Sequence, residues 1–185
     1  MNHARIQGYT LVEMVISVAL FTAVMVIAAS AYLSLIALNR HSRATSDIVA
    51  NLSFAVESMA RSARTGQGYS CSTSWVGGPN CWPGGGNTFS FTNDQGQKVF
   101  YMLKADGRIG ECLGTSSCND SASTPLTDPR VTVQNLTFFT QGVGTSDTLQ
   151  PSVIISVTGS IVPNPGVDPI PFTIQTSATQ RLLEL

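Results

Sequence analysis

The sequence has 185 residues, a formal net charge of −1 and charged side chains at only 11% of its positions. Such a near-neutral balance gives no support to nucleic-acid binding, which depends on a basic surface. Outside one apolar run near the amino terminus, Gly, Ser, Thr and Asn are abundant, as in exported β-rich domains and unlike a cytosolic enzyme. The residues after the predicted first helix, about 120 in number, suffice for one small core and not for two domains.

The apolar run extends from Met14 to Leu38 and contains no charged residue, proline or glycine. As an α-helix these residues would span ~37 Å, which exceeds the hydrocarbon thickness of a bilayer, about 30 Å. The apolar region of a cleaved secretory signal is shorter, roughly 7–15 residues, and normally ends in a small-residue cleavage pattern. Here Arg40 and His41 follow almost directly. The run therefore predicts a membrane-spanning helix.

The segment before this run, residues 8–13, has the sequence Gly-Tyr-Thr-Leu-Val-Glu. A carboxylate such as Glu13 is costly at the edge of a membrane span and indicates a function. A glycine, an aromatic residue, Thr-Leu-Val-Glu and an unbroken span together resemble the type III signal of type IV prepilins and pseudopilins. The resemblance covers residues 1–38 by sequence and the rest of the chain by layout alone. The alternative is a plain membrane anchor that carries a glutamate near its start.

The resemblance implies a processing event and an assembly role. A prepilin peptidase would cleave after Gly8 on the cytoplasmic side and methylate the new amino group of Tyr9. Glu13 would act in assembly by pairing with the amino terminus of a neighbouring subunit, since opposite charges buried together offset their desolvation. The implied partners are the prepilin peptidase, other pilin or pseudopilin subunits, the assembly platform and the inner membrane.

Two positions in the apolar run depart from the pattern of many principal pilins. Thr22 and Ser30 stand where such pilins carry a glycine and a helix-bending proline. The departure favours a minor pilin or a pseudopilin. The order of elements predicted for the head is also similar to that of minor subunits of the J or W type.

Charges beside the run do not fix its orientation, because basic residues both precede it, at Arg5, and follow it, at Arg40 and Arg43. The resemblance implies a cytoplasmic amino terminus, a single pass through the inner membrane, and a head that is periplasmic or extracellular. It divides the chain into a leader peptide (1–8), a transmembrane or fibre-core helix (9–38), an amphipathic helix (39–65) and a β-rich exported head (66–185).

The helix is expected to continue beyond the membrane, because there is no glycine or proline from Ala37 to Ala63. Arg61 and Arg64 suit the carboxyl end of a helix, and Gly66 and Gly68 supply a stop. We therefore expect one helix from Tyr9 to about Thr65. Its second half carries an apolar stripe at helical spacing that should face a sheet: Ile48, Leu52, Ala55, Val56, Met59 and Ala63.

The remaining sequence predicts an antiparallel sheet. Alternating residues bounded by turn signals predict strands at 88–92, 98–104, 108–113, 131–140, 152–162 and 172–183. In the fourth strand, Val131, Val133, Leu136 and Phe138 are expected to face inward. Segments 66–87, 114–128 and 163–171 are expected to be loops. The first loop holds Trp75 and Trp82, which could form a contact surface or fill a gap beneath the loop.

Four cysteines lie beyond the apolar run: Cys71, Cys81, Cys112 and Cys118. An even number in an exported head predicts two disulfides, for which three pairings exist. Pairing Cys71 with Cys81 and Cys112 with Cys118 closes only short loops and is favoured. The rival is a four-thiolate zinc site, but these spacings differ from the short knuckles typical of zinc.

No catalytic constellation is evident in the head. The two histidines are His3, in the leader, and His41, beside the membrane, so neither can complete a nucleophilic triad there. Gly84–Gly86 lacks the Lys-Ser/Thr and the following helix of a phosphate-binding loop. Aspartates are scattered in predicted turns, and none has an EF-hand register, so we name no calcium ligand, no other metal site and no cofactor.

Together these features predict an α+β, pilin-like fold: one long amino-terminal helix packed on an antiparallel β-rich head with disulfide-closed loops. The function implied is that of a structural subunit of a type IV pilus or a type II secretion pseudopilus, and not an enzyme. Surface pili, type II secretion and DNA uptake share the amino-terminal signal. A second hypothesis is a membrane-anchored binding protein that acts through the Trp75 and Trp82 loop and leaves the Gly8–Tyr9 bond uncut. A third is an exported enzyme with a divergent site.

Overall fold

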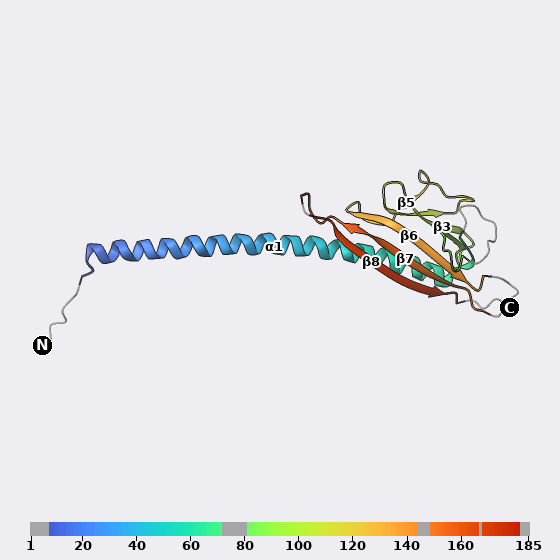
Figure 1. Cartoon of the computed structure of the whole chain (residues 1–185), viewed down its shortest axis with the longest axis horizontal. Coiled ribbons are helices and arrows are strands. Elements are labelled where there is room, and N and C mark those ends of the chain that lie inside the picture. The colour runs from blue at the N-terminus through green and yellow to red at the C-terminus, as the bar shows by residue number, and fades with distance from the viewer. Residues whose placement is uncertain (1–7, 72–80, 144–148, 167, 182–185) are drawn as a thin grey trace. The chain divides into compact units, whose positions relative to one another are not determined.

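The computed structural model describes residues 8–71, 81–143, 149–166 and 168–181. Its described elements are one helix, α1 (Leu11–Thr65), and eight strands (Figure 1). The chain divides into two compact units, Met1–Arg43 and Ala44–Leu185. Helix α1 contributes its first part to the first unit and its last part to the second, and it ends where the sequence predicts, at Thr65.

In the first unit, the apolar side chains of α1 point outward and are exposed, including Leu11 at 80% and Leu33 at 66%. By length and composition α1 could cross a membrane, and it is the one such helix among the described residues. The helix begins at Leu11, two residues later than expected, because Thr10 caps it. Exposed apolar side chains along this part of α1 are the property expected of a segment that lies in lipid or among other helices.

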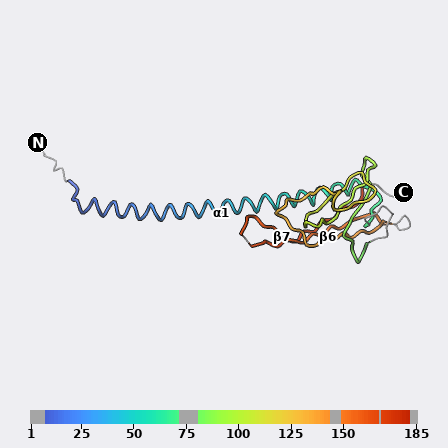
Figure 2. The backbone as a smooth tube through the Cα atoms, turned by 90° about the horizontal axis from the view of Figure 1, so that it is seen from above, coloured from blue at the N-terminus to red at the C-terminus, as the bar shows by residue number. Residues whose placement is uncertain are grey.

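The second unit contains two antiparallel sheets, whereas the sequence predicted a single antiparallel sheet. The first sheet has the strand order β1-β2-β3-β4-β5, and the second has the order β6-β7-β8. Strands β6 and β7 are labelled as neighbours in the backbone trace of Figure 2. The strands of the first sheet are β1 (Gln67–Ser70), β2 (Thr88–Thr92), β3 (Lys98–Leu103), β4 (Ile109–Leu113) and β5 (Thr124–Pro125). Those of the second are β6 (Val131–Gln141), β7 (Ser152–Ile161) and β8 (Ile170–Thr179).

Three expectations about loops and strand ends were wrong. Strand β1 lies in the segment 66–87, which was expected to be a loop. It was missed because its four residues, one of them Gly68, carry too little pattern. Strand β5 lies in the expected loop 114–128 and has only two residues, one of them a proline. Strand β8 begins at Ile170, and Pro171 pairs with Ser160 inside the expected connection. A proline is tolerated there because β8 is an edge strand. The strand was also expected to continue to Leu183, but β8 ends at Thr179, and residues 182–185 lie outside the described residues.

The core of the second unit lies between the last part of α1 and the two sheets. The predicted stripe is buried: Ile48, Leu52, Ala55, Val56, Met59 and Ala63 are each exposed by 3% or less. All of these side chains except Ala55 join a cluster of apolar residues from both sheets. The rings of Phe89 on β2 and Phe138 on β6 stack with centroids 5.5 Å apart, so the same cluster holds the sheets together. The stripe prediction is therefore confirmed.

The carboxyl end of α1 is fixed by hydrogen bonds to its last carbonyl groups. The Tyr69 hydroxyl donates to the Ala63 carbonyl at 2.6 Å, and the Arg181 N–H donates to the Arg64 carbonyl at 2.9 Å. Gly66 follows the helix against the ring of Phe91, where an added Cβ would lie 2.2 Å from Cδ2. No larger residue fits there without movement of the core.

Strand β6 changes the direction of its side chains partway along. Val131 and Val133 are buried, and so are Leu136 and Phe138, so the buried positions pass from odd to even numbers. The pairing with β7 shifts between Val133 and Asn135, which is a β-bulge. The inward residues expected from the sequence are all buried, and the bulge is the reason for their uneven spacing.

Candidate functional site

The first candidate site is the start of α1. Thr10 precedes the helix, and its Oγ1 accepts a hydrogen bond from the Glu13 N–H at 3.3 Å. Thr10 and Glu13 thus stand at the two positions of a capping box, in which a side chain satisfies a helix N–H that has no carbonyl partner. A carboxylate in the first turn also suits the positive end of the helix dipole. The T-x-x-E spacing was present in the sequence but was not recognised as a cap.

Gly8 and Tyr9 lie before the helix in exposed, non-helical backbone. Tyr9 is 80% exposed, and an added Cβ on Gly8 would meet no atom within 4 Å. The Gly8–Tyr9 bond is thus open to an enzyme that needs extended backbone. The leader residues 1–7 lie outside the described residues.

The two polar residues inside the apolar run bond within the helix. The hydroxyl of Thr22 donates to the Ala19 carbonyl at 2.9 Å, and that of Ser30 donates to the Ile27 carbonyl at 2.8 Å. Each hydroxyl is satisfied by its own helix, so neither presents an unpaired polar group to an apolar surrounding. Helix α1 therefore stays unbroken at the positions where glycine and proline were expected for a principal pilin.

The two disulfides close short loops. Cys71 pairs with Cys81 and Cys112 with Cys118, the pairing that the sequence analysis favoured. The Cys81 N–H donates to Thr140 Oγ1 at 3.2 Å, which ties the first loop to β6. Each of the four cysteines therefore belongs to one of the two disulfides.

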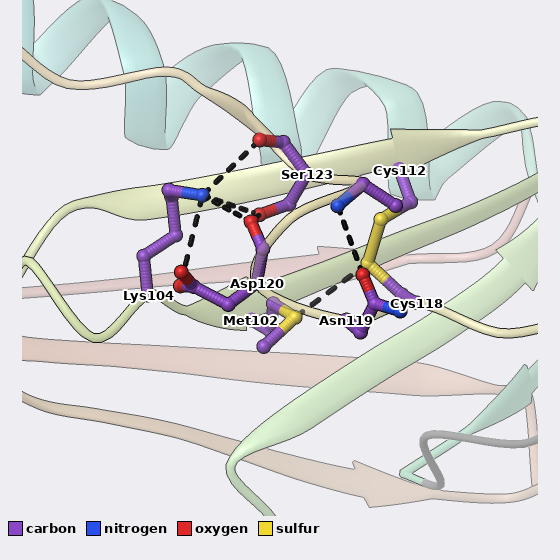
Figure 3. The surroundings of a disulfide bond; sticks show 8 residues. Met102, Lys104, Cys112, Cys118, Asn119, Asp120 and Ser123 are labelled. Atoms are coloured by element: carbon purple, nitrogen blue, oxygen red, sulfur yellow. Dashed lines mark hydrogen bonds and ion pairs between the residues drawn. A yellow bond between two sulfur atoms is a disulfide. The ribbon is translucent and has the colours of Figure 1, made fainter.

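A nearly buried lysine, which no sequence pattern had indicated, holds the segment that follows the second disulfide loop (Figure 3). The side chain of Lys104 is only 9% exposed. Its ammonium group donates to the carbonyl of Asp120 and to Ser123 at Oγ (2.9 Å) and at the carbonyl (3.2 Å). The Asp120 carboxylate accepts from the Ala105 N–H at 2.8 Å. A buried amine with this many oxygen partners fixes this segment and is not free to react.

The shifted carboxyl groups of the head have structural causes. Hydrogen bonds from Arg108 hold the pKa of Asp106 below its ordinary value. Arg130 has the same effect on the pKa of Asp128. Each arginine lies two residues after its aspartate and also donates its backbone N–H to it, as in turn chemistry. Among the described residues no group of three His, Cys, Asp or Glu side chains is placed to hold a metal ion.

Two buried tyrosines also have shifted pKa values. Burial raises the pKa of Tyr69 well above its ordinary value. Burial, with a further contribution from the Glu111 carboxylate, raises the pKa of Tyr101 in the same direction. Both rings belong to the core cluster, so these shifts record packing and do not mark an acid–base site.

Of the two loop tryptophans, the structure places one. Trp82 is 52% exposed, and its ring meets Phe139 of β6 edge-on with centroids 5.9 Å apart. It therefore lies on the surface and does not fill a gap beneath the loop. Trp75 lies outside the described residues, so a joint surface of the two rings stays a prediction.

Comparison with known proteins identifies the first of these regions. Residues 3–29 match the family described as the prokaryotic N-terminal methylation motif. No curated protein and no solved structure matches the chain. The amino-terminal segment is thus a type IV prepilin signal, and the long helix with its antiparallel sheets and two disulfides is a pilin-like α+β architecture. The signal supports prepilin-type processing of the chain.

Proposed function

We propose that the chain is a minor structural subunit of a type IV pilus or a type II secretion pseudopilus. The observation that carries this proposal is the methylation motif at residues 3–29, placed at the start of an unbroken helix whose first part exposes its apolar side chains. The prepilin-type signal belongs to structural subunits, so the proposed role is structural and not enzymatic. The absence of a helix-breaking residue at Thr22 and Ser30 favours the minor type.

In the proposed pathway the prepilin peptidase removes residues 1–8 and methylates Tyr9. Residues 9–38 then hold the subunit in the inner membrane as a single span, with the amphipathic helix (39–65) and the head (66–185) on the far side. Assembly exchanges lipid for the helices of other subunits, so the apolar surface need not meet water. The assembly platform and the other pilin or pseudopilin subunits are the partners. A membrane-anchored binding protein without a fibre is the second candidate, and the methylation motif argues against it.

We assign Glu13 to assembly, where its carboxylate would pair with the methylated amino terminus of a neighbouring subunit. The Glu13 side chain also stands at the third helical position of a capping box, which offers a second, purely local role. The hydrogen bond present there is made by its backbone N–H, which donates to Thr10 Oγ1. The two roles make different demands: the pairing needs a negative charge, whereas a glutamine at the third helical position also completes a capping box.

The variants Glu13→Ala and Glu13→Gln separate these roles. Both should be processed at close to the normal rate, and both should be lost from sheared fibres when the subunit is followed by immunoblot. If Glu13→Gln enters fibres normally and Glu13→Ala does not, capping and not charge is what assembly requires. Normal incorporation of Glu13→Ala would refute any assembly role for this residue.

A further inference from the structure

A polar cavity of about 350 Å³ opens where the loop before β2 meets strand β6. Its wall is formed by Gly84–Asn87 on one side and by Gln134–Thr137 on the other, with Leu103 of β3 beside them. The volume falls within the range of small-ligand sites, ~300–1,000 Å³. None of these lining residues is ionisable, so the cavity offers amides, a hydroxyl and main-chain groups and no charge.

The bulge in β6 directs two consecutive amide side chains outward. In a regular strand, neighbours alternate between faces, and one of Gln134 and Asn135 would turn toward the core. The register shift between Val133 and Asn135 removes this constraint, and both amides are exposed at the cavity. Asn87 is exposed opposite them. Bulges often re-aim side chains beside binding and active sites.

The same strand also presents main-chain groups to the cavity. Phe138 directs its N–H and C=O away from β7, and both bond to Gly86 at 2.8 Å. Because these groups alternate along a strand, the N–H and C=O of Leu136 point to the same edge. Leu136 lies in the cavity wall. Along this edge of β6, Phe138 bonds to Gly86 on one side of Leu136 and Val133 bonds to Gly107 on the other. The main-chain N–H and C=O of Leu136 therefore face the cavity between these two contacts.

The turn that forms the opposite wall is held at both ends, and it carries an exposed aromatic ring beside the cavity-lining residues. The Cys71–Cys81 disulfide and the paired Gly86 fix the two ends of the turn. Gly85 has a positive φ of 72°, and an added Cβ would lie 2.5 Å from the Thr137 Cγ2, so only glycine fits. The exposed ring of Trp82 stands in the same turn. The site is therefore shaped before any ligand arrives.

We propose that this cavity binds a neutral oligosaccharide. Planar amides and main-chain groups can donate to and accept from sugar hydroxyls at once, which suits a ligand with many hydroxyls and no charge. An exposed indole offers a flat apolar face to the C–H side of a sugar ring. An anionic sugar would lack a cationic partner there. This proposal concerns the head alone and does not depend on processing or on fibre assembly.

The test uses the full chain, purified in a detergent without a sugar headgroup so that the detergent does not compete. Cellotetraose, chitotetraose, maltotetraose and a galactose-terminated tetrasaccharide are titrated by saturation-transfer NMR and calorimetry. We expect saturable binding of at least one of them. Gln134→Ala and Asn135→Ala should each weaken it about 3- to 10-fold, the range for loss of one hydrogen bond between neutral groups. Trp82→Ala should weaken it in the same direction.

Gln175→Ala is the matched control, because this amide is exposed on β8, outside the cavity wall, and its loss should leave binding unchanged. The side chains of Gln134 and Asn135 are both exposed, so the two alanine variants should fold. A near-ultraviolet circular dichroism spectrum of each variant checks this. The proposal is overturned if none of the four sugars binds at millimolar concentration, or if binding ignores Gln134 and Asn135. The proposed ligand class would be overturned if sialylated or sulfated sugars bound more tightly than the neutral sugars. It would also be overturned if an extended peptide bound more tightly and these variants abolished its binding.

Discussion

Single residues determine where α1 begins and where it ends. At the start, Thr10 satisfies the N–H of Glu13, so the helix forms within two residues of the proposed cleavage point. At the end, Gly66 lets the chain pass the ring of Phe91. The sequence predicted the end of the helix through a glycine, whereas the start was expected at Tyr9, two residues too early, because the T-x-x-E pattern was not read as a cap. It did not indicate that Gly66 is required for space as well as for stopping the helix, because that depends on a ring 25 residues away.

The packing at Gly66 predicts that Gly66→Ala destabilises the head. An added Cβ would lie 2.2 Å from Phe91 Cδ2, and overpacking of this kind costs about 1–3 kcal/mol. Gly84→Ala is the control, because its Cβ would meet nothing within 4 Å, and its effect should stay within about 0.5 kcal/mol. Urea unfolding of the full chain in detergent, followed by near-ultraviolet dichroism, measures both. Equal midpoints for the two variants would contradict the packing described here.

Among the elements, α1 and the longer strands follow directly from local pattern. The helical spacing of the stripe and the alternation in β6 to β8 are each set by residues close in sequence. The uneven inward set in β6, which passes from Val133 to Leu136, held a signal for the bulge. Strands β1 and β5 could not be found, because they are short and are defined by the partners they pair with. Their hydrogen bonds come from the fold and not from their own composition.

The two faces of α1 within the second unit predict opposite outcomes for neighbouring truncations. Leu52 is 1% exposed in the core cluster, so Leu52→Ala should cost about 2–5 kcal/mol through lost burial and a cavity. Phe54 is 73% exposed, so Phe54→Ala should change the stability of the isolated subunit by no more than about 0.5 kcal/mol. The same urea experiment compares them. A larger loss for Phe54→Ala would mean that the assignment of the buried face is wrong.

For the molecule as a whole, a long apolar helix followed by antiparallel strands was predictable because each part has its own composition. The favoured disulfide pairing was predictable because it closes the shortest loops. The separation of the head into two sheets was not, since it depends on pairings between distant segments. The same holds for the cavity, whose walls come from residues 84–87 and 134–137. Lys104 and the segment around Ser123 likewise meet only through the fold.

The central claim is that a prepilin peptidase handles this chain, and the mass of its amino terminus tests this most directly. The protein is extracted from membranes, weighed intact and fragmented from its amino end. The account predicts a chain that begins at Tyr9 and carries one additional methyl group on its amine. A chain that begins at Met1 or Asn2, or that is cut after the apolar run, would contradict it, and the head would then have to act as an independent anchored or secreted module.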